Sequence, residues 1–350
     1  MNKTVNIKFS NSKHKPMQPE NITVDDLYGF AEYAAPIFEY SLNLFKKKFQ
    51  KKTGIECNVS IGPQKERKRV EDKLKEADIE GNPSNILDIL RGTVTVETIE
   101  DLLEFLNFTR KLEFTKKDFS KASFDEEILS GIKARIEKVV KKRNFENHYG
   151  KKLSKEEFDS IVDKELTLAK KRIALSCEKM EDLPIPNVAI SNSFSFNVDN
   201  NLKQKYDFLT TKPRVKNSNY MDFKFYVCIP IPTFGLEKEK DYMICEVIAT
   251  LNCFDKVYDK THCLLEKTRN FKEKEDDDIE PDTFKLAFDT LSRCMYVDGV
   301  IEKYNNMYPN KIQIVPHNDD KMLREDILNK VSGSITLTKA LCNCRDWKRC

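Results

Sequence analysis

The stretch Ile86-Leu-Asp-Ile-Leu-Arg-Gly-Thr-Val-Thr-Val96 is the clearest strand signal in the chain, and it points to a fold built on a β-sheet. Apolar and β-branched residues dominate it, which is typical of a strand buried in a sheet. Two charged residues, Asp88 and Arg91, interrupt the run. Burying an unpaired charge is costly, so a carboxylate in this place requires a partner or a chemical role. Asp88 is therefore the first candidate site residue.

Two more strands are predicted in the second half of the chain. Residues 220–231 alternate in polarity, and residues 241–250 form an apolar run after a polar turn. The second run also holds a single acid, Glu246. With the helices predicted around them, these strands favour an α/β (α+β) fold in which a mixed β-sheet is flanked by helices.

Amphipathic helices are predicted on both sides of the 86–96 strand. Thr23 has the character of an N-cap and opens a helix that Pro36 is expected to kink. Residues 98–111 form a second amphipathic helix. The apolar face of the first helix consists of Leu27, Phe30, Ala34, Phe38, Leu42 and Phe45.

A basic helix is predicted after the turn at Gly62-Pro63. Lys65, Arg69 and Lys73 follow at intervals of four residues, so they share one face of that helix. A solvated surface is the ordinary interpretation of such a face. A cluster of phosphate ligands is the functional alternative.

Residues 115–182 differ in character from the rest, because they are rich in Lys and Glu and poor in Gly and Pro. They predict two helices, at about 124–143 and 155–178, with a capping box formed by Ser154 and Glu157. A lid, an arm for a protein partner or oligomer, and mere elaboration all remain open for this insertion. The predicted organisation is an N-terminal tail (1–24), a first part of the main domain (25–114), the helical insertion (115–182), a second part of the main domain (183–275) and a mostly helical C-terminal region (276–350).

Composition excludes several classes of function. The chain has 350 residues and 33% charged residues, but its net charge is only +3, which argues against a DNA-binding coat. It has no apolar run long enough to span a membrane, and its N-terminus does not look like a secretory signal. We therefore expect a cytoplasmic protein in a reducing compartment. Three cysteines near the C-terminus, Cys342, Cys344 and Cys350, lack a second ligand pair of metal-site spacing.

Two buried-looking acids that are distant in sequence suggest a shared Mg²⁺ ion. Magnesium is commonly held by one or two carboxylates together with substrate phosphates. Asp88 and Glu246 supply the carboxylates, while nearby Lys and Arg residues supply charge for phosphates. This combination is typical of phosphoryl-type transfer, which depends on positioning and charge stabilisation.

The order of these motifs resembles the RelA/SpoT family of (p)ppGpp synthetases. The resemblance covers about residues 40–110 and 205–270, less than half of the chain. It implies a nucleotidyltransferase-like fold, and it implies transfer of pyrophosphate from ATP to the 3′-hydroxyl of GDP or GTP, without a hydrolase domain. The segments that carry it are 62–73, 86–94, Pro213-Arg-Val-Lys-Asn-Ser-Asn-Tyr-Met-Asp-Phe-Lys224, Ile244-Cys-Glu-Val247 and 255–266.

The resemblance also implies roles for individual residues. Asp88 and Glu246 would be catalytic and hold Mg²⁺, and Glu246 would also be placed to accept the proton of the attacking hydroxyl. The residues implied for ATP are Lys65, Arg69, Lys73 and Arg91, and those implied for the acceptor are Arg214, Lys216, Tyr220 and His262.

Two departures from the family pattern concern the acceptor. Family members usually have Gly-Tyr-Arg where this chain has Asn-Tyr-Met at 219–221, and a Gln two residues after the glutamate where it has Ile248. Ile248 cannot form hydrogen bonds through its side chain. Two alternatives therefore stay open: a toxin-like member that modifies adenine nucleotides or tRNA 3′ ends, and a degenerate nucleotide-binding module that interacts with other proteins.

Overall fold

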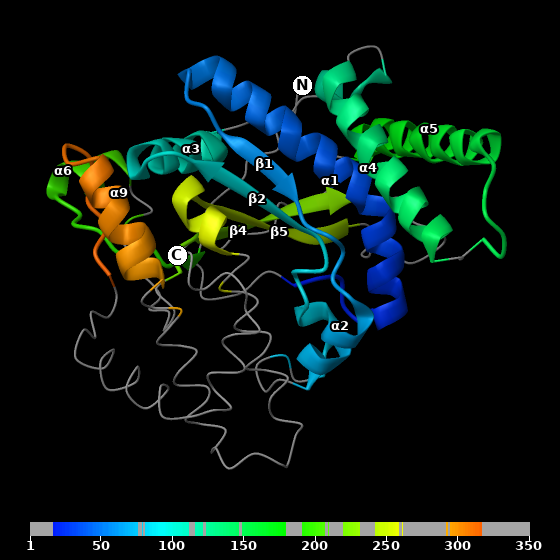
Figure 1. Ribbon diagram of the computed structural model, residues 1–350, viewed down its shortest axis with the longest axis horizontal. Coiled ribbons are helices and arrows are strands. Elements are labelled where there is room, and N and C mark those ends of the chain that lie inside the picture. Colours follow the sequence, from blue (N-terminus) through cyan, green and yellow to red (C-terminus); the bar gives the residue numbers. More distant parts are fainter. Residues whose placement is uncertain are drawn as a thin grey trace. The chain divides into compact units, whose positions relative to one another are not determined.

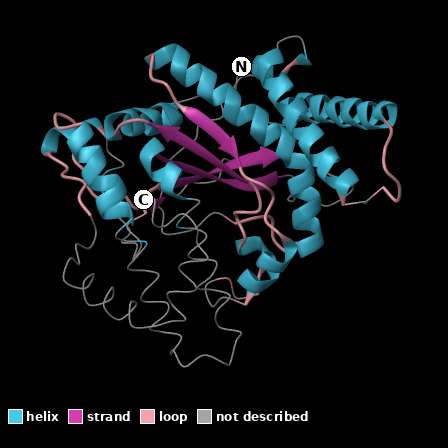
Figure 2. Cartoon of the chain, in the orientation of Figure 1, coloured by secondary structure: helices cyan, strands magenta, loops and turns pink. Residues whose placement is uncertain are grey.

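A five-stranded mixed sheet with strand order β1-β2-β5-β4-β3 organises the computed structural model (Figure 1). The strand arrows point in both directions across the sheet, and helices surround it (Figure 2). The fold class predicted from the sequence, a mixed sheet flanked by helices, is therefore confirmed. The strands are β1 (Asn58–Ile61), β2 (Arg91–Val96), β3 (Ser191–Asn192), β4 (Phe223–Pro230) and β5 (Tyr242–Leu251).

The chain divides into two compact units. The first comprises Met1–Val94, Phe105–Ile190 and Lys224–Ile248, and the second comprises Thr95–Glu104, Ser191–Phe223 and Ala249–Cys350. The domain limits expected from the sequence follow motifs rather than contacts, and they stay a prediction. The structure describes residues 17–75, 79, 81–111, 116–121, 124–146, 149–179, 191–206, 209, 220–231, 242–258, 261, 292 and 295–316.

The helices predicted at 98–111, 124–143 and 155–178 are confirmed, and their ends lie within two residues of the predicted ones. No helix among the described residues has the length and apolarity that crossing a membrane requires. The α-helices are α1 (Val24–Thr53), α2 (Arg67–Leu74), α3 (Ile99–Lys111), α4 (Glu126–Phe145), α5 (Lys155–Lys179), α6 (Asn200–Lys205) and α9 (Glu302–Met307), with 3-10 turns at Pro83–Asn85 and Lys116–Phe119 and a π-helical turn at Val297–Ile301.

Helix α1 begins and ends as its sequence predicts. Thr23 caps it, and the Thr23 side chain and backbone exchange hydrogen bonds with Asp26 in a capping box. Gly54 ends it with φ of +73°, a left-handed conformation that Gly adopts without steric cost. All six residues of the predicted apolar face are buried, so that prediction is confirmed.

The predicted helical insertion packs against α1 in the first unit. An ion pair joins the buried Glu39 of α1 to the partly exposed Arg135 of α4 at 2.7 Å. Arg172 of α5 donates from Nη1 to the Glu32 carbonyl at 2.9 Å, and its guanidinium lies 5.1 Å from the centre of the Tyr33 ring. Helices α4 and α5 therefore pack against α1, and Arg135 and Arg172 are among the residues that make the contact (Figure 1). Their predicted role toward a protein partner stays a prediction.

The strand predicted over 86–96 is shorter in the structure. Residues 86–90 form no strand, and β2 begins only at Arg91. At Ile86 the N–H donates to the Pro83 carbonyl and the carbonyl accepts from Gln18, and Gln18 also bonds to both the N–H and the carbonyl of Ile244, so Ile86 and Ile244 do not pair directly as strand neighbours. Asp88 is thus a residue of an irregular segment, not of a strand as the sequence suggested.

Two other predicted elements also begin later than expected. Helix α2 starts at Arg67, so Lys65 precedes the helix and does not share a helical face with Arg69 and Lys73. Strand β4 starts at Phe223, so Tyr220 precedes the strand that the alternating pattern predicted. In both cases the sequence pattern extends to residues that precede the first residue of the regular helix or strand.

Candidate active site

Asp88 lies between two lysines. Lys65 Nζ is 2.6 Å from Asp88 Oδ2, and Lys73 Nζ is 3.1 Å from Asp88 Oδ1. Burial, which leaves the Asp88 side chain 15% exposed, would raise the pKa of the carboxyl, but the two lysines outweigh it and lower the pKa to about 2. Asp88 is therefore ionised at neutral pH, as a metal ligand must be.

Burial has the opposite consequence for Lys65. Desolvation lowers the pKa of its ammonium, and this outweighs the favourable charge of Asp88. Lys73 and Arg91 also lower the pKa of Lys65 by repulsion, so three cations are close to a single carboxylate. The cluster has excess positive charge, which an anion with several oxygens would neutralise.

The backbone of Lys65 is anchored from two sides. Its N–H donates to the Ile89 carbonyl at 3.1 Å, and the Tyr28 hydroxyl donates to the Lys65 carbonyl at 2.7 Å. The guanidinium of Arg67 lies over the Tyr28 ring, 5.9 Å from its centre. Tyr28 is not recognisable from the sequence as part of the site, because a Tyr on a helix gives no signal of a partner that belongs to the backbone of another segment.

The side chain of Arg91 lies on the face of the sheet opposite α1. Its neighbour Gly92 faces α1, since a Cβ atom at that position would collide with Leu42 and lie 3.1 Å from Phe38 Cζ. Side chains alternate along a strand, so Arg91 points to the other face. Its Nε is buried and forms no hydrogen bond with the described residues. A buried donor of this kind is suited to an incoming acceptor.

Lys224 of β4 and Glu246 of β5 lie on that same face. Phe225, the neighbour of Lys224, packs against Phe105 of α3, and Phe105 in turn packs against Phe45 of α1. Lys224 therefore points away from α1 and α3. Its Nζ is 3.3 Å from Glu246 Oε2, which puts the glutamate on the face that carries Arg91.

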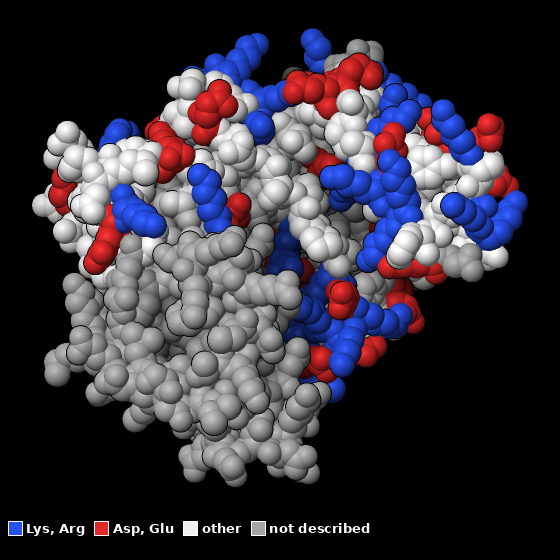
Figure 3. All heavy atoms as spheres, viewed as in Figure 1, with Lys and Arg blue, Asp and Glu red and all other residues white. Residues whose placement is uncertain are grey.

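A backbone hydrogen bond joins the segment that carries Asp88 to the strand that carries Glu246. The N–H of Glu246 donates to the Leu90 carbonyl at 3.1 Å, two residues beyond Asp88. The segments of the two acids are thus joined within one unit, although 157 residues of sequence lie between Asp88 and Glu246. Figure 3 shows basic and acidic side chains crowded together over α2, the helix that carries Lys73.

The donor set suits Mg²⁺ combined with a phosphate ligand. Two carboxylates are available, which matches the one or two that Mg²⁺ commonly takes when substrate phosphates complete its shell. The described residues contain no group of three or more His, Cys, Asp or Glu side chains arranged for a metal. A cation here would therefore depend on phosphate oxygens, and both carboxylates would have to exchange lysine contacts for it.

Arg69 and the predicted acceptor residues are less well defined. Arg69 is half-buried on α2, and its contacts do not decide its role. Arg214, Lys216 and His262 lie outside the described residues, as do Cys342, Cys344 and Cys350.

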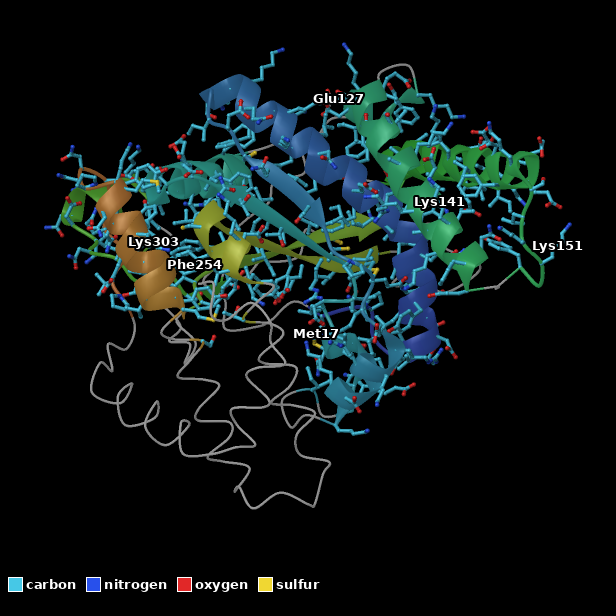
Figure 4. All side chains as sticks on the ribbon, viewed as in Figure 1. Met17, Glu127, Lys141, Lys151, Phe254 and Lys303 are labelled. Carbon is cyan, nitrogen blue, oxygen red and sulfur yellow. The ribbon has the colours of Figure 1, made fainter. Side chains whose placement is uncertain are left out.

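Tyr220 lies in an aromatic cluster of the second unit. Its ring centre is 6.4 Å from that of Phe254, 5.3 Å from that of Tyr258 and 5.7 Å from that of Tyr296. Phe254 belongs to the helical residues that follow β5 (Figure 4). Burial raises the pKa of the Tyr220 phenol, and the nearby Asp222 carboxylate adds to the effect. The predicted role of Tyr220 in stacking on an acceptor base stays a prediction.

Comparisons with known proteins give a distant similarity. No family model matches the sequence, and no curated protein matches it. Two solved structures are similar in part: the small alarmone synthetase 1 from Bacillus subtilis and a GTP pyrophosphokinase family protein from Streptococcus pneumoniae. Each is 11% identical to this chain with a TM-score of 0.35, and each match covers 81% of this chain and 98% of the other.

Proposed function

We propose that this protein is a Mg²⁺-dependent nucleotide pyrophosphokinase that resembles the RelA/SpoT synthetases. It transfers a pyrophosphate group from ATP to the 3′-hydroxyl of GDP or GTP. The observation that carries this proposal is the position of Asp88, an ionised acid held by Lys65 and Lys73. A carboxylate among several cations is suited to bind a metal ion and a polyphosphate together, because the carboxylate binds the metal and the cations bind the phosphates.

The residues of the site have separate tasks in this reaction. Lys65, Lys73 and Arg91 bind the phosphates of ATP and neutralise the charge that accumulates during transfer. Mg²⁺, when bound, is held by Asp88 and Glu246 and adds to that neutralisation. Glu246 also accepts the proton from the attacking hydroxyl.

The transfer itself requires one bond to form and one to break. The 3′-oxygen of the acceptor bonds to the β-phosphorus of ATP, and the bond from that phosphorus to the α–β bridging oxygen breaks. AMP leaves, and the acceptor carries the β- and γ-phosphates. This chain supplies position and charge for the step and forms no covalent intermediate.

A panel of acceptors tests the proposal. ATP labelled at the γ-phosphate is incubated with the protein, Mg²⁺ and one of GDP, GTP, ADP or tRNA, and the products are separated by chromatography. We expect label to move to GDP or GTP together with release of AMP. Absence of transfer to every acceptor, despite calorimetric binding of ATP, would instead favour the degenerate nucleotide-binding module.

A different acceptor is the second candidate, and two residues favour it. Met221 and Ile248 stand where the family usually has Arg and Gln, and both side chains are buried in the structure, at 0% and 8% exposure. Neither can offer a hydrogen bond to a guanine nucleotide from such a position. Transfer to ADP or to the 3′ end of tRNA in the same panel, without transfer to GDP or GTP, would support this alternative.

A further inference from the structure

Gln18 joins the two segments that carry the candidate metal ligands. Its Nε2 donates to the carbonyl of Ile86 at 3.1 Å and to the carbonyl of Ile244 at 2.9 Å. Its Oε1 accepts a hydrogen bond from the Ile244 N–H at 2.9 Å. The side chain is buried, with 1% exposure, so all three bonds are shielded from water.

These contacts have a fixed relation to the two acids. Ile86 precedes Asp88 by two residues, and Ile244 precedes Glu246 by two residues. Gln18 therefore bonds to each segment two residues before its acid, and its carboxamide sets the distance between the two backbones at that point. Further along the chain, the Glu246 N–H donates to the Leu90 carbonyl at 3.1 Å, so the same two segments are joined at a second point.

A carboxamide is the group that this place requires. Two carbonyls need a donor and one N–H needs an acceptor, and a buried backbone group without a partner is costly. Gln provides both functions at the required length. Gln18 is itself anchored, because its N–H donates to the Ser84 carbonyl at 2.9 Å and Ser84 Oγ donates to the Pro19 carbonyl at 2.8 Å.

We propose that Gln18 is a positioning residue for cation binding, and that it fixes the separation of the Asp88 and Glu246 carboxylates through the backbone. This inference rests on the proposed function, since it requires that the two acids share a cation. Residues outside the ligand shell that orient metal ligands typically affect metal affinity by about 10- to 100-fold. Gln18 acts on both ligands at once, so its loss affects the cation more than either nucleotide.

The test measures the binding of Mn²⁺, used as a probe for Mg²⁺, by electron paramagnetic resonance on the full chain with saturating ATP, which supplies the phosphate oxygens, and without acceptor. Gln18→Met keeps the volume of the side chain and removes its donor and acceptor functions. We expect the Kd for Mn²⁺ to rise about tenfold. Thr109→Val is the matched control, because it also removes a buried side-chain bond to a backbone carbonyl, that of Phe105, and we expect it to leave the Kd unchanged.

A second variant, Gln18→Glu, tests the same role in case Gln18→Met does not fold. Gln18→Glu keeps the acceptor for the Ile244 N–H, and as a neutral acid it keeps one donor. We expect a smaller rise in the Kd for Mn²⁺, about threefold, and a Kd equal to that of the unaltered protein would count against the inference.

The outcomes separate this inference from the proposed function. If Gln18→Met binds Mn²⁺ as tightly as the unaltered protein, the positioning role is wrong, while pyrophosphate transfer by the unaltered protein would leave the proposed function standing. If the unaltered protein binds no more Mn²⁺ than Asp88→Asn does, no shared cation exists and both proposals fail.

Discussion

Lys65 Nζ lies 2.6 Å from Asp88 Oδ2, so a candidate phosphate ligand and a candidate metal ligand hold each other. Lys73 completes the arrangement from the other carboxylate oxygen. Without a ligand, the Asp88 carboxylate forms the ion pairs with Lys65 and Lys73 that a phosphate group would otherwise form. Metal and nucleotide should therefore bind cooperatively. A phosphate that takes the two lysines leaves the Asp88 carboxylate without an ion pair, and a metal ion that takes the carboxylate leaves the lysines without one.

The first prediction concerns Asp88→Asn. This change removes the negative charge that competes for Lys65 and Lys73, so we expect ATP to bind about tenfold more tightly when no divalent cation is present. With Mg²⁺ present, we expect turnover to be lost. Isothermal titration calorimetry in a chelating buffer measures the first effect, and weaker binding of metal-free ATP by Asp88→Asn would contradict it.

The second prediction concerns stability in acid. Burial would raise the pKa of Asp88, but Lys65 and Lys73 lower it to about 2, below the ordinary value of 3.8. The ion pairs thus stabilise the fold above about pH 4, and this contribution is lost as the pH falls toward about 2. The shift corresponds to about 2 kcal/mol at most, and the desolvation of Lys65 reduces it.

Urea unfolding of the unaltered protein and of Asp88→Asn, compared across this pH range, tests that prediction. We expect the difference in free energy of unfolding to shrink as the pH falls from about 4 to about 2. Asp72→Asn is the control, since the Asp72–Lys75 pair is exposed and should contribute little at any pH. A difference for Asp88→Asn that stays constant with pH would show that the ion pairs do not stabilise the fold.

The third prediction concerns Tyr28→Phe, which removes only the hydroxyl that donates to the Lys65 carbonyl. One neutral hydrogen bond is worth about 1 kcal/mol, so we expect the Kd for ATP to rise about fivefold. The KM for the acceptor should not change. Tyr242→Phe removes a hydroxyl that donates to the Met17 carbonyl, and it should affect neither constant. Equal effects of the two variants on ATP would exclude a specific role for Tyr28.

The fourth prediction concerns the close contact between β2 and α1. A methyl group at Gly92 would collide with Leu42 and crowd Phe38, so we expect Gly92→Ala to lower the free energy of unfolding by about 1–3 kcal/mol. Gly131 in α4 has open space around it, and Gly131→Ala should raise stability by about 0.5–1 kcal/mol. Chemical denaturation measures both, and two changes of the same sign would contradict the packing described for α1.

The sequence predicted regular, locally determined features well. The apolar face of α1 and its cap at Thr23 follow from helical periodicity and from capping chemistry, and both are confirmed. The capping box of α5 at Ser154 and Glu157 is confirmed for the same reason. These features depend on residues that are neighbours along the chain.

The sequence did not predict features that depend on distant partners. The apolar run at 86–90 has the composition of a strand, but the Ile86 carbonyl bonds to the distant Gln18 side chain, which no local pattern reveals. The ion pair between Asp88 and Lys65 is not predicted either, because the sequence pattern puts Lys65 on a helix that begins only at Arg67. Composition and spacing single out Asp88, Glu246 and the three basic residues, the family resemblance adds the acceptor residues, and the spatial relation of all of them depends on contacts between distant segments.

The decisive measurement is the transfer of label from γ-labelled ATP to a nucleotide acceptor by the unaltered protein and by Asp88→Asn. We expect a Mg²⁺-dependent product that carries the β- and γ-phosphates of ATP on its 3′-hydroxyl, with equal release of AMP. We also expect a loss of about a hundredfold or more in the variant, on the order of the losses seen when charge stabilisation is removed. Transfer at the same rate by both proteins, or hydrolysis of ATP without transfer to any acceptor, would contradict the proposed function.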